Sequence, residues 1–564
     1  MIRKLLLAFS FTGISAFSLF AQTPKSPDEA IHPRIMTSAV PANLRSGNPD
    51  EPHAAAVTLD SSNLPIVYIR TNWQWIADEP KITAQMGIID HGYNQVNHVT
   101  DTPNDYNGYI GIERRGSISQ LWPQKSYSVE TRDSAGNALD ASLLSMHSDN
   151  DWVLYGPYDD KAMMRNVMTY QLGREMGYWA PNTKYVELVI NTYGWPEYQG
   201  VYVLMEKVKR DHHRVDIAKL DSTENTGDDL TGGYIFALDR NIWANDSGFV
   251  SSQPQGLFFS YKYPDGDKIT PQQKAYLKAY VDSFETAMAA PNFDDLTNGF
   301  RKYAYEQSFM DYFFFCEMSK NIDAYKRSSY FYKDKYSNGG KIHCGPLWDY
   351  NSAWWNIHYC GFDTIGGWDY PMTCWVSSAP VPFWWSRMLQ DSIYSRDLKC
   401  RWITWRNSVL DTNHIFHILD SIANYIAPAT TRQYQQYTFT ENFQNQVDSL
   451  KWWISHRIAW MDANMPGNCW NLGVNDPPLD DGAFAVYPNP ANDEIAVKFD
   501  FAESENISFD LLDPLGKKIN TLSPKNYSPG ENHVEFDLSQ LPPGIYFVQI
   551  HSGMNSVTKK VIKL

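Results

Sequence analysis

The pattern of apolar and polar residues divides the chain into regions of different character. Over residues 64 to about 472, short stretches in which apolar and polar residues alternate are interleaved with longer stretches in which apolar residues recur at helical spacing. We therefore predict one large α+β domain over residues 57–473. Residues 22–56 and 474–483 are rich in Pro and small polar residues, and we interpret both segments as linkers.

The C-terminal region, residues 484–564, contains short strand patterns only. Turn signals such as Pro488-Asn489-Pro490 and Pro542-Pro543-Gly544 separate these strands. Several short strands at this spacing predict a small β-sandwich. The predicted strands cover residues 494–499, 507–512, 533–538, 544–551 and 558–564.

The N-terminus has the pattern of a secretory signal. Arg3 and Lys4 are followed by an apolar stretch over residues 5–20, and small residues surround a predicted cleavage point after Ala21. The alternative is a membrane anchor, but the stretch is short for a span of about 20 apolar residues and a polar, Pro-rich segment follows it. We expect residues 1–21 to be a signal peptide and the mature chain to have no transmembrane span.

Charge and cysteine content narrow the functional classes. The formal net charge is −16, and an acidic surface repels phosphate backbones, so we expect no nucleic-acid partner. An even number of cysteines in an exported chain suggests disulfides, although the sequence leaves their connectivity open and shows no zinc-like spacing. The six cysteines are Cys316, Cys344, Cys360, Cys374, Cys400 and Cys469.

The main candidate for chemistry is a pair of carboxylates on either side of a predicted hairpin. Asp323 follows an aromatic-rich helix, residues 328–333 and 341–347 have strand patterns, and Asn338-Gly339-Gly340 is a turn signal between them. Folding back at this turn returns Asp349 to the end where Asp323 lies. Such a pair suits phosphoryl transfer, because one carboxylate can accept the proton of the attacking hydroxyl while the other holds Mg²⁺.

Three residues upstream could complete a nucleotide site. Lys125 lies near the start of an alternating strand and could neutralise phosphate charge, although a lone lysine there is more often a solvated edge residue. Arg165 lies on a predicted helix that Asp159 or Asp160 caps, and it could instead pair with one of these aspartates. Glu206 ends a predicted strand and could help shape the site. Alternatively, it could be a rim residue.

The order of these features resembles the CotH kinase family, the spore-coat protein H type of atypical secreted kinases. The resemblance extends over residues 64 to about 470. It implies an atypical protein-kinase-like two-lobed domain that uses ATP and Mg²⁺ to phosphorylate Ser or Thr hydroxyls of exported or surface proteins. The matching blocks are Arg115-Gly116-Ser117 to Lys125-Ser126-Tyr127, Met164-Arg165-Asn166, Tyr198-Gln199-Gly200-Val201-Tyr202 with Glu206, Asn321-Ile322-Asp323, Tyr330-Phe331-Tyr332 and Gly345-Pro346-Leu347-Trp348-Asp349-Tyr350.

The resemblance assigns a role to each candidate residue. Asp323 is then the catalytic aspartate, Lys125 a catalytic and phosphate-binding lysine, and Asp349 a metal ligand. Arg165 and Glu206 would shape the nucleotide site.

Ser328 and Asn351 take the two further metal-ligand positions of the family. The family commonly has Asn at the first of these positions and Asp at the second. Both substitutes still offer oxygen, but each is a poorer Mg²⁺ ligand. A catalytically degenerate, kinase-like surface protein that binds protein or glycan is therefore the competing interpretation.

The C-terminal region resembles the C-terminal sorting domain of the type IX secretion system. This resemblance implies the type IX secretion machinery as a partner, and a secreted or cell-surface location in a Gram-negative bacterium. The matching residues are Tyr487-Pro488-Asn489-Pro490-Ala491, Leu515-Gly516-Lys517, Gly544-Ile545-Tyr546-Phe547-Val548 and Lys559-Lys560-Val561-Ile562-Lys563-Leu564.

A Trp-rich region follows Asp349. Aromatic residues in a large domain usually belong to its core, but exposed tryptophans could also stack on sugars or on a protein partner. This alternative leaves a glycan partner open. The tryptophans concerned are Trp354, Trp355, Trp368, Trp375, Trp384, Trp385, Trp402 and Trp405.

Overall fold

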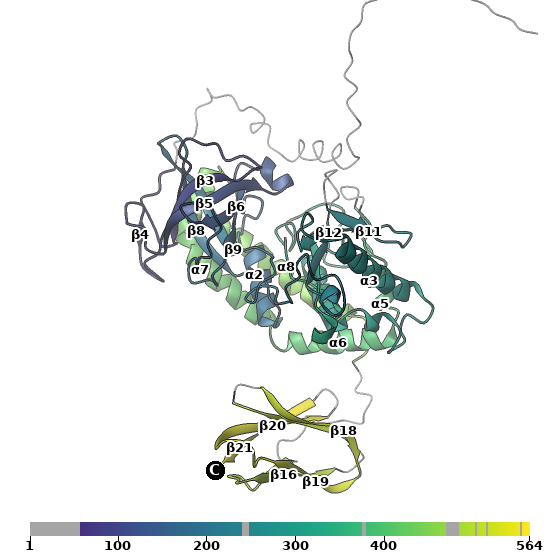
Figure 1. The fold of residues 1–564 in the computed structure, drawn as a ribbon. Helices are drawn as coiled ribbons and strands as arrows, with labels where there is room; N and C mark the ends of the chain where they lie inside the picture. Colours follow the sequence, from purple (N-terminus) through teal and green to yellow (C-terminus); the bar gives the residue numbers. More distant parts are fainter. Residues whose placement is uncertain are drawn as a thin grey trace, which may run out of the picture. The chain divides into compact units, whose positions relative to one another are not determined.

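The computed structural model describes residues 57–239, 247–374, 379–469, 484–501, 505–514, 517–552 and 555–564. They belong to two units, one ending at Asn468 and the other beginning at Cys469 (Figure 1). The predicted signal peptide (1–21) and the two predicted linkers (22–56 and 474–483) lie outside the described residues. Among the residues that are described, no helix combines the length and the hydrophobicity needed to cross a membrane.

Seven strands at the start of the first unit close into a β-barrel. Neighbouring strands are antiparallel except for β2 and β8, whose parallel pairing closes the barrel. Apolar side chains alternate inward along the strands and fill the interior, where Trp152 is fully buried. In barrel order the strands are β2 (Ile66–Arg70), β3 (Ile82–Ile89), β5 (Tyr106–Arg115), β6 (Ser126–Arg132), β7 (Asp151–Tyr155), β9 (Pro196–Glu206) and β8 (Thr183–Asn191).

A second sheet, of five strands, lies beside helices in the rest of the first unit. In spatial order its strands are β11 (Gly248–Val250), β12 (Phe258–Tyr263), β10 (Tyr234–Leu238), β13 (Ser329–Lys333) and β14 (Ile342–Cys344). The helices are α2 (Arg165–Glu175), α3 (Pro271–Ala289), α4 (Glu306–Ser319), α5 (Trp384–Met388), α6 (Ser392–Arg406), α7 (Thr412–Gln436) and α8 (Phe443–Asn464). The domain is therefore mixed α and β, as its sequence pattern predicts. Short strands β1 (Ser61–Ser62) and β4 (Asn97–His98) pair with each other at the edge of the barrel.

Helix α7 fastens the helical part to the barrel. It lies along β8 and β9 in Figure 1, and Gln433 Oε1 accepts a hydrogen bond from the main-chain N–H of Val201 (2.8 Å). Arg432 donates to Glu187 Oε1 (2.8 Å), a carboxylate that is fully buried in β8. Gly200 has φ +98°, and a Cβ there would lie 2.2 Å from Gln433 Oε1, so only glycine allows this approach.

The second unit is a β-sandwich of one three-stranded and one four-stranded sheet. Apolar residues of both sheets, including Phe499 and Phe509, form its core. The five strands predicted here are present, and the sequence pattern missed β15 and β18. The strands are β15 (Phe484–Tyr487), β16 (Glu494–Phe501), β17 (Glu505–Leu512), β18 (Lys518–Tyr527), β19 (Gly530–Asp537), β20 (Gly544–Ser552) and β21 (Asn555–Lys563).

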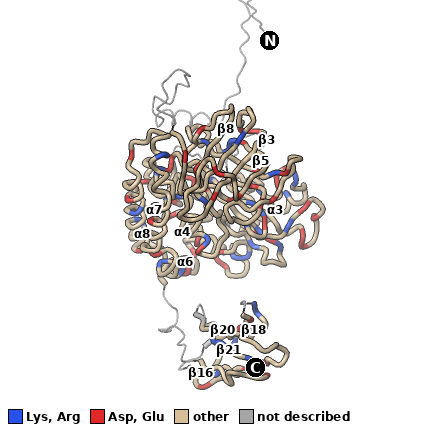
Figure 2. The backbone as a smooth tube through the Cα atoms, turned by 90° about the vertical axis from the view of Figure 1, so that its left-hand side faces the viewer, with Lys and Arg blue, Asp and Glu red and all other residues tan. Residues whose placement is uncertain are grey.

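Four of the six cysteines form disulfides, as expected for an exported chain. Cys360 is bonded to Cys374, and Cys400 and Cys469 are also disulfide-bonded. Cys316 and Cys344 are free thiols buried in the core. Basic and acidic residues are interspersed along the backbone of the first unit (Figure 2).

A buried ion pair joins two helices of the first unit. Glu317 of α4 and Arg457 of α8 both have fully buried side chains, and Arg457 Nη2 lies 3.3 Å from Glu317 Oε2. The same guanidinium donates to the main-chain carbonyls of Ile365 (2.6 Å) and Gly367 (2.7 Å). One buried cation therefore fixes both the helix pair and the loop beside it.

Replacing Arg457 by Met tests this arrangement. The variant leaves a carboxylate buried without its counter-charge, and we expect the free energy of unfolding to fall by about 3–5 kcal/mol. All Trp residues of the chain except Trp470 precede the second unit, so Trp fluorescence during urea unfolding reports mainly on the first unit. Lys268→Met, in a pair with Asp265 in which both side chains are exposed, is the control and should cost less than about 1 kcal/mol. Equal losses for both variants would contradict this account.

Candidate active site

The predicted hairpin is present and brings the two candidate carboxylates together. Strands β13 and β14 pair antiparallel, with Phe331 opposite Cys344, and Gly339 and Gly340 turn the chain with φ of 98° and 64°. The charge of Asp323 acts on the Asp349 carboxyl. The prediction that this turn returns Asp349 to the neighbourhood of Asp323 is therefore confirmed.

A third carboxylate, Asp159, joins this pair from the loop between β7 and α2. Burial, and after it the charges of Asp323 and Asp159, raise the pKa of Asp349 to about 7. Burial also raises the pKa of Asp159. We call Asp159, Asp323 and Asp349 the acid cluster.

Ser328 and Asn351 each contact one member of the acid cluster. Ser328 Oγ donates to Asp349 Oδ2 at 3.2 Å, and Asn351 Nδ2 donates to Asp159 Oδ2 at 2.7 Å. The metal-ligand roles that the family resemblance implies for both residues stay predictions. The Asn351 amide nitrogen faces an acid, an orientation that stabilises the ionised form of Asp159.

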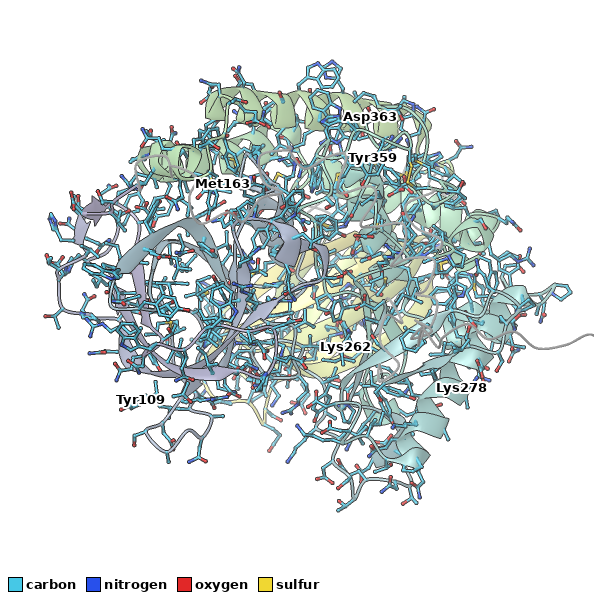
Figure 3. All side chains as sticks on the ribbon, turned by 90° about the horizontal axis from the view of Figure 1, so that it is seen from above. Tyr109, Met163, Lys262, Lys278, Tyr359 and Asp363 are labelled. Atoms are coloured by element: carbon cyan, nitrogen blue, oxygen red, sulfur yellow. A yellow bond between two sulfur atoms is a disulfide. The ribbon has the colours of Figure 1, made fainter. Side chains whose placement is uncertain are left out.

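Arg115, at the end of barrel strand β5, is the cation that acts on Asp349. Its guanidinium lies over the Trp348 ring, 5.4 Å from the ring centroid. The charges of Lys262, Arg115 and Asp349 act on the hydroxyl of Tyr330 in β13. Lys262 lies between the barrel and α3 in Figure 3. The acid cluster therefore faces the junction between the barrel and the second sheet.

Lys125 has a different setting from the acid cluster. Its ammonium donates to the main-chain carbonyls of Gln120 (2.8 Å) and Trp122 (2.5 Å), and so holds the turn before β6. Burial lowers its pKa, and the neighbouring charge that acts on it is that of Arg114. The structure does not bring the Lys125 ammonium to Asp349, and the predicted phosphate contact of this lysine stays a prediction.

Arg165 and Glu206 are both buried. Arg165 pairs with Asp160, which was the alternative from sequence, and its Nε donates to the carbonyls of Ala353 (3.1 Å) and Trp354 (3.2 Å). It therefore supports the loop that follows Asp349. Glu206 Oε2 accepts from the Asn182 main-chain N–H (2.9 Å), while Glu206 Oε1 has no hydrogen-bond partner within the described chain.

Left-handed backbone conformations are frequent around the acid cluster. A positive φ is costly for bulky residues and persists only where the surrounding structure enforces it. Such residues often mark functional sites. The residues concerned are Met163 (59°), Lys320 (42°), Tyr325 (68°), Ser328 (48°), Asp349 (66°), Trp354 (53°) and Trp355 (62°).

The acid cluster fits the chemistry of Mg²⁺. Its donors are all oxygens, and a divalent cation would relieve the repulsion that raises the pKa of Asp349. Tyr155 Oη, on which the charges of Asp159 and Asp349 act, is buried without a hydrogen-bond partner in the described residues. No group of three His, Cys, Asp or Glu residues forms a ready metal cage in the described chain. Mg²⁺ often takes only one or two carboxylates and completes its shell with phosphate and water.

Two family models match the chain. The model described as CotH kinase protein matches residues 112–461, which is more than half of the chain. The chain belongs to the CotH kinase protein family. The model described as secretion system C-terminal sorting domain matches residues 485–564. No curated protein matches the chain.

The sorting domain identifies this CotH family member as a secreted or surface protein. Its matching residues coincide with the β-sandwich of the second unit. The site residues that the sequence reasoning placed together all lie within the matched CotH region.

Sequence reasoning missed Asp159 and Arg115 as site residues of this CotH domain. Asp159 carried a signal as a polar residue before a helix, but the same signal fits a helix cap. Arg115 lies in a matching block, one residue before Gly116, but the resemblance assigns the phosphate-binding role to Lys125 of the same block. Only the closed barrel shows that the end of β5 approaches the acid cluster.

The Trp-rich region belongs mainly to the core of the CotH domain. Trp354, Trp384, Trp385 and Trp402 are 2% exposed or less. Trp355, Trp368 and Trp405 are partly buried against the same core, and Trp375 lies outside the described residues. The core interpretation is therefore confirmed for the four buried tryptophans, which cannot stack on sugars.

A cavity of about 190 Å³ lies close to the acid cluster along the chain but does not include it. Gly345, Pro346 and Leu347, which lead to Asp349, line it together with Trp179. None of the three carboxylates contributes to the lining. The acid cluster and this cavity are separate features.

Asp349→Asn tests the electrostatics of the acid cluster. A folded-state pKa raised to about 7 means that ionising Asp349 costs stability as pH rises from about 4 through 7. Asn removes this cost and also tolerates positive φ. In metal-free buffer at pH 8 we expect the variant to be more stable than the natural protein by about 1–2 kcal/mol, and the two to converge near pH 4.

Thermal unfolding between pH 4 and 8 measures this difference. Asp265→Asn, which changes an exposed aspartate, is the control and should leave the pH profile unchanged. A natural protein that is more stable than Asp349→Asn at pH 8 would show that the acid cluster is not under electrostatic strain.

Proposed function

We propose that this CotH family member is a kinase that transfers the γ-phosphoryl group of ATP, with Mg²⁺, to Ser or Thr hydroxyls of exported or surface proteins. We propose further that the type IX secretion machinery carries it across the outer membrane of a Gram-negative cell, after removal of a signal peptide. The family and the sorting domain support both parts.

One observation carries the proposal. The charges of Asp323 and Asp159 both act on Asp349, which follows the β13–β14 hairpin, and burial together with these charges raises the pKa of Asp349 to about 7. Holding like charges together costs free energy, and a protein retains such a cluster where a cation or a proton transfer uses it. Structural packing alone gains nothing from this repulsion.

The residues divide the work of phosphoryl transfer among them. Asp323, whose side chain is 24% exposed, can accept the proton of an attacking hydroxyl, and Arg115 can neutralise phosphate oxygens from the barrel side. Asp349, Ser328 and Asn351 would hold Mg²⁺, with Asp159 beside them. Bound Mg²⁺ supplies neutralisation of the phosphate charge during transfer. Arg165 and Glu206 would help shape the nucleotide site, and Arg165 would do so by holding the loop after Asp349.

The barrel and the helical part would then be the two lobes of an atypical kinase. Arg115 comes from the barrel, whereas Asp323 and Asp349 come from the segment around the second sheet. ATP bound at their junction would contact both parts. A two-lobed arrangement of this kind explains why the charged groups face the junction.

A second function, binding without catalysis, has one observation in its favour. Asn351 replaces an acid and directs its amide nitrogen at Asp159, which occupies one carboxylate oxygen with a hydrogen bond. A site of this kind has less negative charge for Mg²⁺. On this alternative the domain binds nucleotide or a surface partner but transfers no phosphate.

Incorporation of labelled phosphate from ATP into exported proteins separates the two functions. We expect transfer by the natural protein with Mg²⁺, and a loss of at least about 1,000-fold in Asp323→Asn and Asp349→Asn. Asp265→Asn is the control and should remain active. Binding of Mg²⁺–ATP, detected as a rise in Tm, without any transfer would establish the non-catalytic function instead.

Arg115 and Lys125 can be compared directly, because each is a basic residue at the edge of the barrel. We expect Arg115→Met to raise the KM for ATP at least about tenfold, since a phosphate-facing cation is lost. Lys125→Met should change KM less than about threefold, because its ammonium holds main-chain carbonyls. The reverse order would establish the phosphate role that the family resemblance gives to Lys125. Steady-state kinetics at saturating acceptor measure both.

A further inference from the structure

Two loops at one end of the barrel expose aromatic rings. One follows β2 and the other joins β8 to β9, and we call residues 71–75 and 191–195 the paired loops. Trp73 is 71% exposed, Tyr193 47% and Trp195 78%. Large aromatic side chains are usually mostly buried, and exposed rings that gather in one place mark a binding surface. The paired loops read Thr71-Asn72-Trp73-Gln74-Trp75 and Asn191-Thr192-Tyr193-Gly194-Trp195.

Main-chain hydrogen bonds hold the paired loops side by side. Strands β2 and β8 pair in parallel, so both loops leave the barrel at the same end. The N–H of Thr71 donates to the Asn191 carbonyl (3.1 Å), and the N–H of Trp73 donates to the Thr192 carbonyl (3.0 Å). The paired loops therefore form one continuous surface.

The three exposed rings form one patch on this surface. The ring centroids of Trp73 and Tyr193 are 5.9 Å apart, and the ring planes are tilted by 56°, so neither ring lies flat on the other. A Cβ at Gly194 would lie 3.8 Å from Trp73 Cζ2, so the indole reaches the turn between Tyr193 and Trp195. We call Trp73, Tyr193 and Trp195 the aromatic patch.

The backbone that carries the aromatic patch is strained at one side. Asn72 and Trp73 have φ of 52° and 66°. This region is unfavourable for a bulky side chain, and burial offsets little of the cost at Trp73 because most of this residue is exposed. The hydrogen bond to Thr192 enforces the conformation. A costly backbone that displays an exposed ring is more typical of a binding position than of packing.

The composition of the paired loops matches a neutral sugar. Apart from the aromatic residues they contain only Asn, Gln, Thr and Gly. An aromatic face carries partial negative charge and attracts the partially positive C–H face of a pyranose ring, while amides and hydroxyls match its hydroxyl groups. The loops contain no cation for a phosphate or an anionic lipid. They also lack the Met and Arg that protein interfaces typically add to their aromatic residues.

Two other exposed aromatic residues of the barrel have a partner over the ring. The guanidinium of Arg114 lies 4.1 Å from the centroid of the Trp75 ring. Tyr93 is 76% exposed and stacks on Tyr425, with ring centroids 6.0 Å apart. Tyr93 follows β3, which is antiparallel to β2, so it lies at the opposite end of the barrel from the paired loops. Tyr93 therefore provides a matched control for the aromatic patch.

We propose that the aromatic patch binds a neutral polysaccharide, whose pyranose rings stack on Trp73, Tyr193 and Trp195. Rings from two loops offer stacking positions to more than one sugar, which favours a chain over a single monosaccharide. The site is separate from the acid cluster and does not depend on the proposed kinase function. Its role is to hold a secreted or surface protein at a glycan-bearing surface.

Affinity electrophoresis of the full-length secreted protein tests the proposal. Native gels contain one of four neutral polymers, namely glucomannan, xylan, laminarin or dextran. We expect at least one polymer to retard the natural protein, and Trp73→Ala and Trp195→Ala each to raise the Kd for it at least about tenfold. Trp195→Phe keeps a ring and should raise the Kd less than about threefold, and Tyr93→Ala should leave it unchanged. High salt should leave the retardation intact, because the ligand is neutral.

Trp73→Gly separates binding from a structural role. Glycine removes the ring and also accepts a positive φ, so we expect weaker binding together with a Tm at or above that of the natural protein. A Tm well below the natural value would show that the Trp73 ring serves packing, and would overturn its place in the aromatic patch.

Three further results would overturn the proposal as a whole. The first is a natural protein that none of the four polymers retards. The second is retardation that survives both Trp73→Ala and Trp195→Ala, because the polymer is then bound elsewhere. The third is binding to phosphatidylglycerol vesicles or to a surface protein that the same two variants abolish, in the absence of polymer binding. None of these results affects the kinase function, which labelled phosphate tests independently.

Discussion

Repulsion among carboxylates is the constraint on which the site depends. Asp159, Asp323 and Asp349 come from three separate segments of the chain, and burial together with the charges of Asp323 and Asp159 raises the pKa of Asp349 to about 7. Water would weaken this repulsion, and the fold instead encloses the acids between a barrel and a second sheet. Such an arrangement suits a cation and an anionic phosphate that arrive together.

The surrounding structure resists this repulsion with rigid, buried polar groups. Arg457 and Lys320 bind main-chain carbonyls of residues 365 and 366, and Arg165 binds a carbonyl of the loop after Asp349. Several bulky residues there adopt positive φ, which isolated loops would not maintain. The stability of the helical core therefore offsets the free-energy cost of the backbone strain and of the buried charge at the site. The Cys360–Cys374 disulfide closes the loop that completes the enclosure.

Local patterns in the sequence predicted the elements, and long-range packing decided the site. The hairpin around Gly339 and the strands of the β-sandwich follow from turn signals and alternation, which act over a few residues. The closure of β2 against β8 joins residues more than a hundred positions apart, and no local signal encodes it. For this reason the sequence alone could not predict that Arg115 and Asp159 lie near Asp349. Lys125 met the local criteria for a phosphate-facing lysine, yet the structure directs its ammonium to main-chain carbonyls.

A crystal structure with Mn²⁺ and a non-hydrolysable ATP analogue tests the central claim most directly. Mn²⁺ replaces Mg²⁺ at oxygen-rich sites and is located by its anomalous scattering. We predict a metal peak bound to an Asp349 carboxylate oxygen and to phosphate oxygens, with the γ-phosphate facing Asp323. Metal and nucleotide bound away from Asp349, or a nucleotide held with Asp323 turned away from its phosphates, would contradict the account.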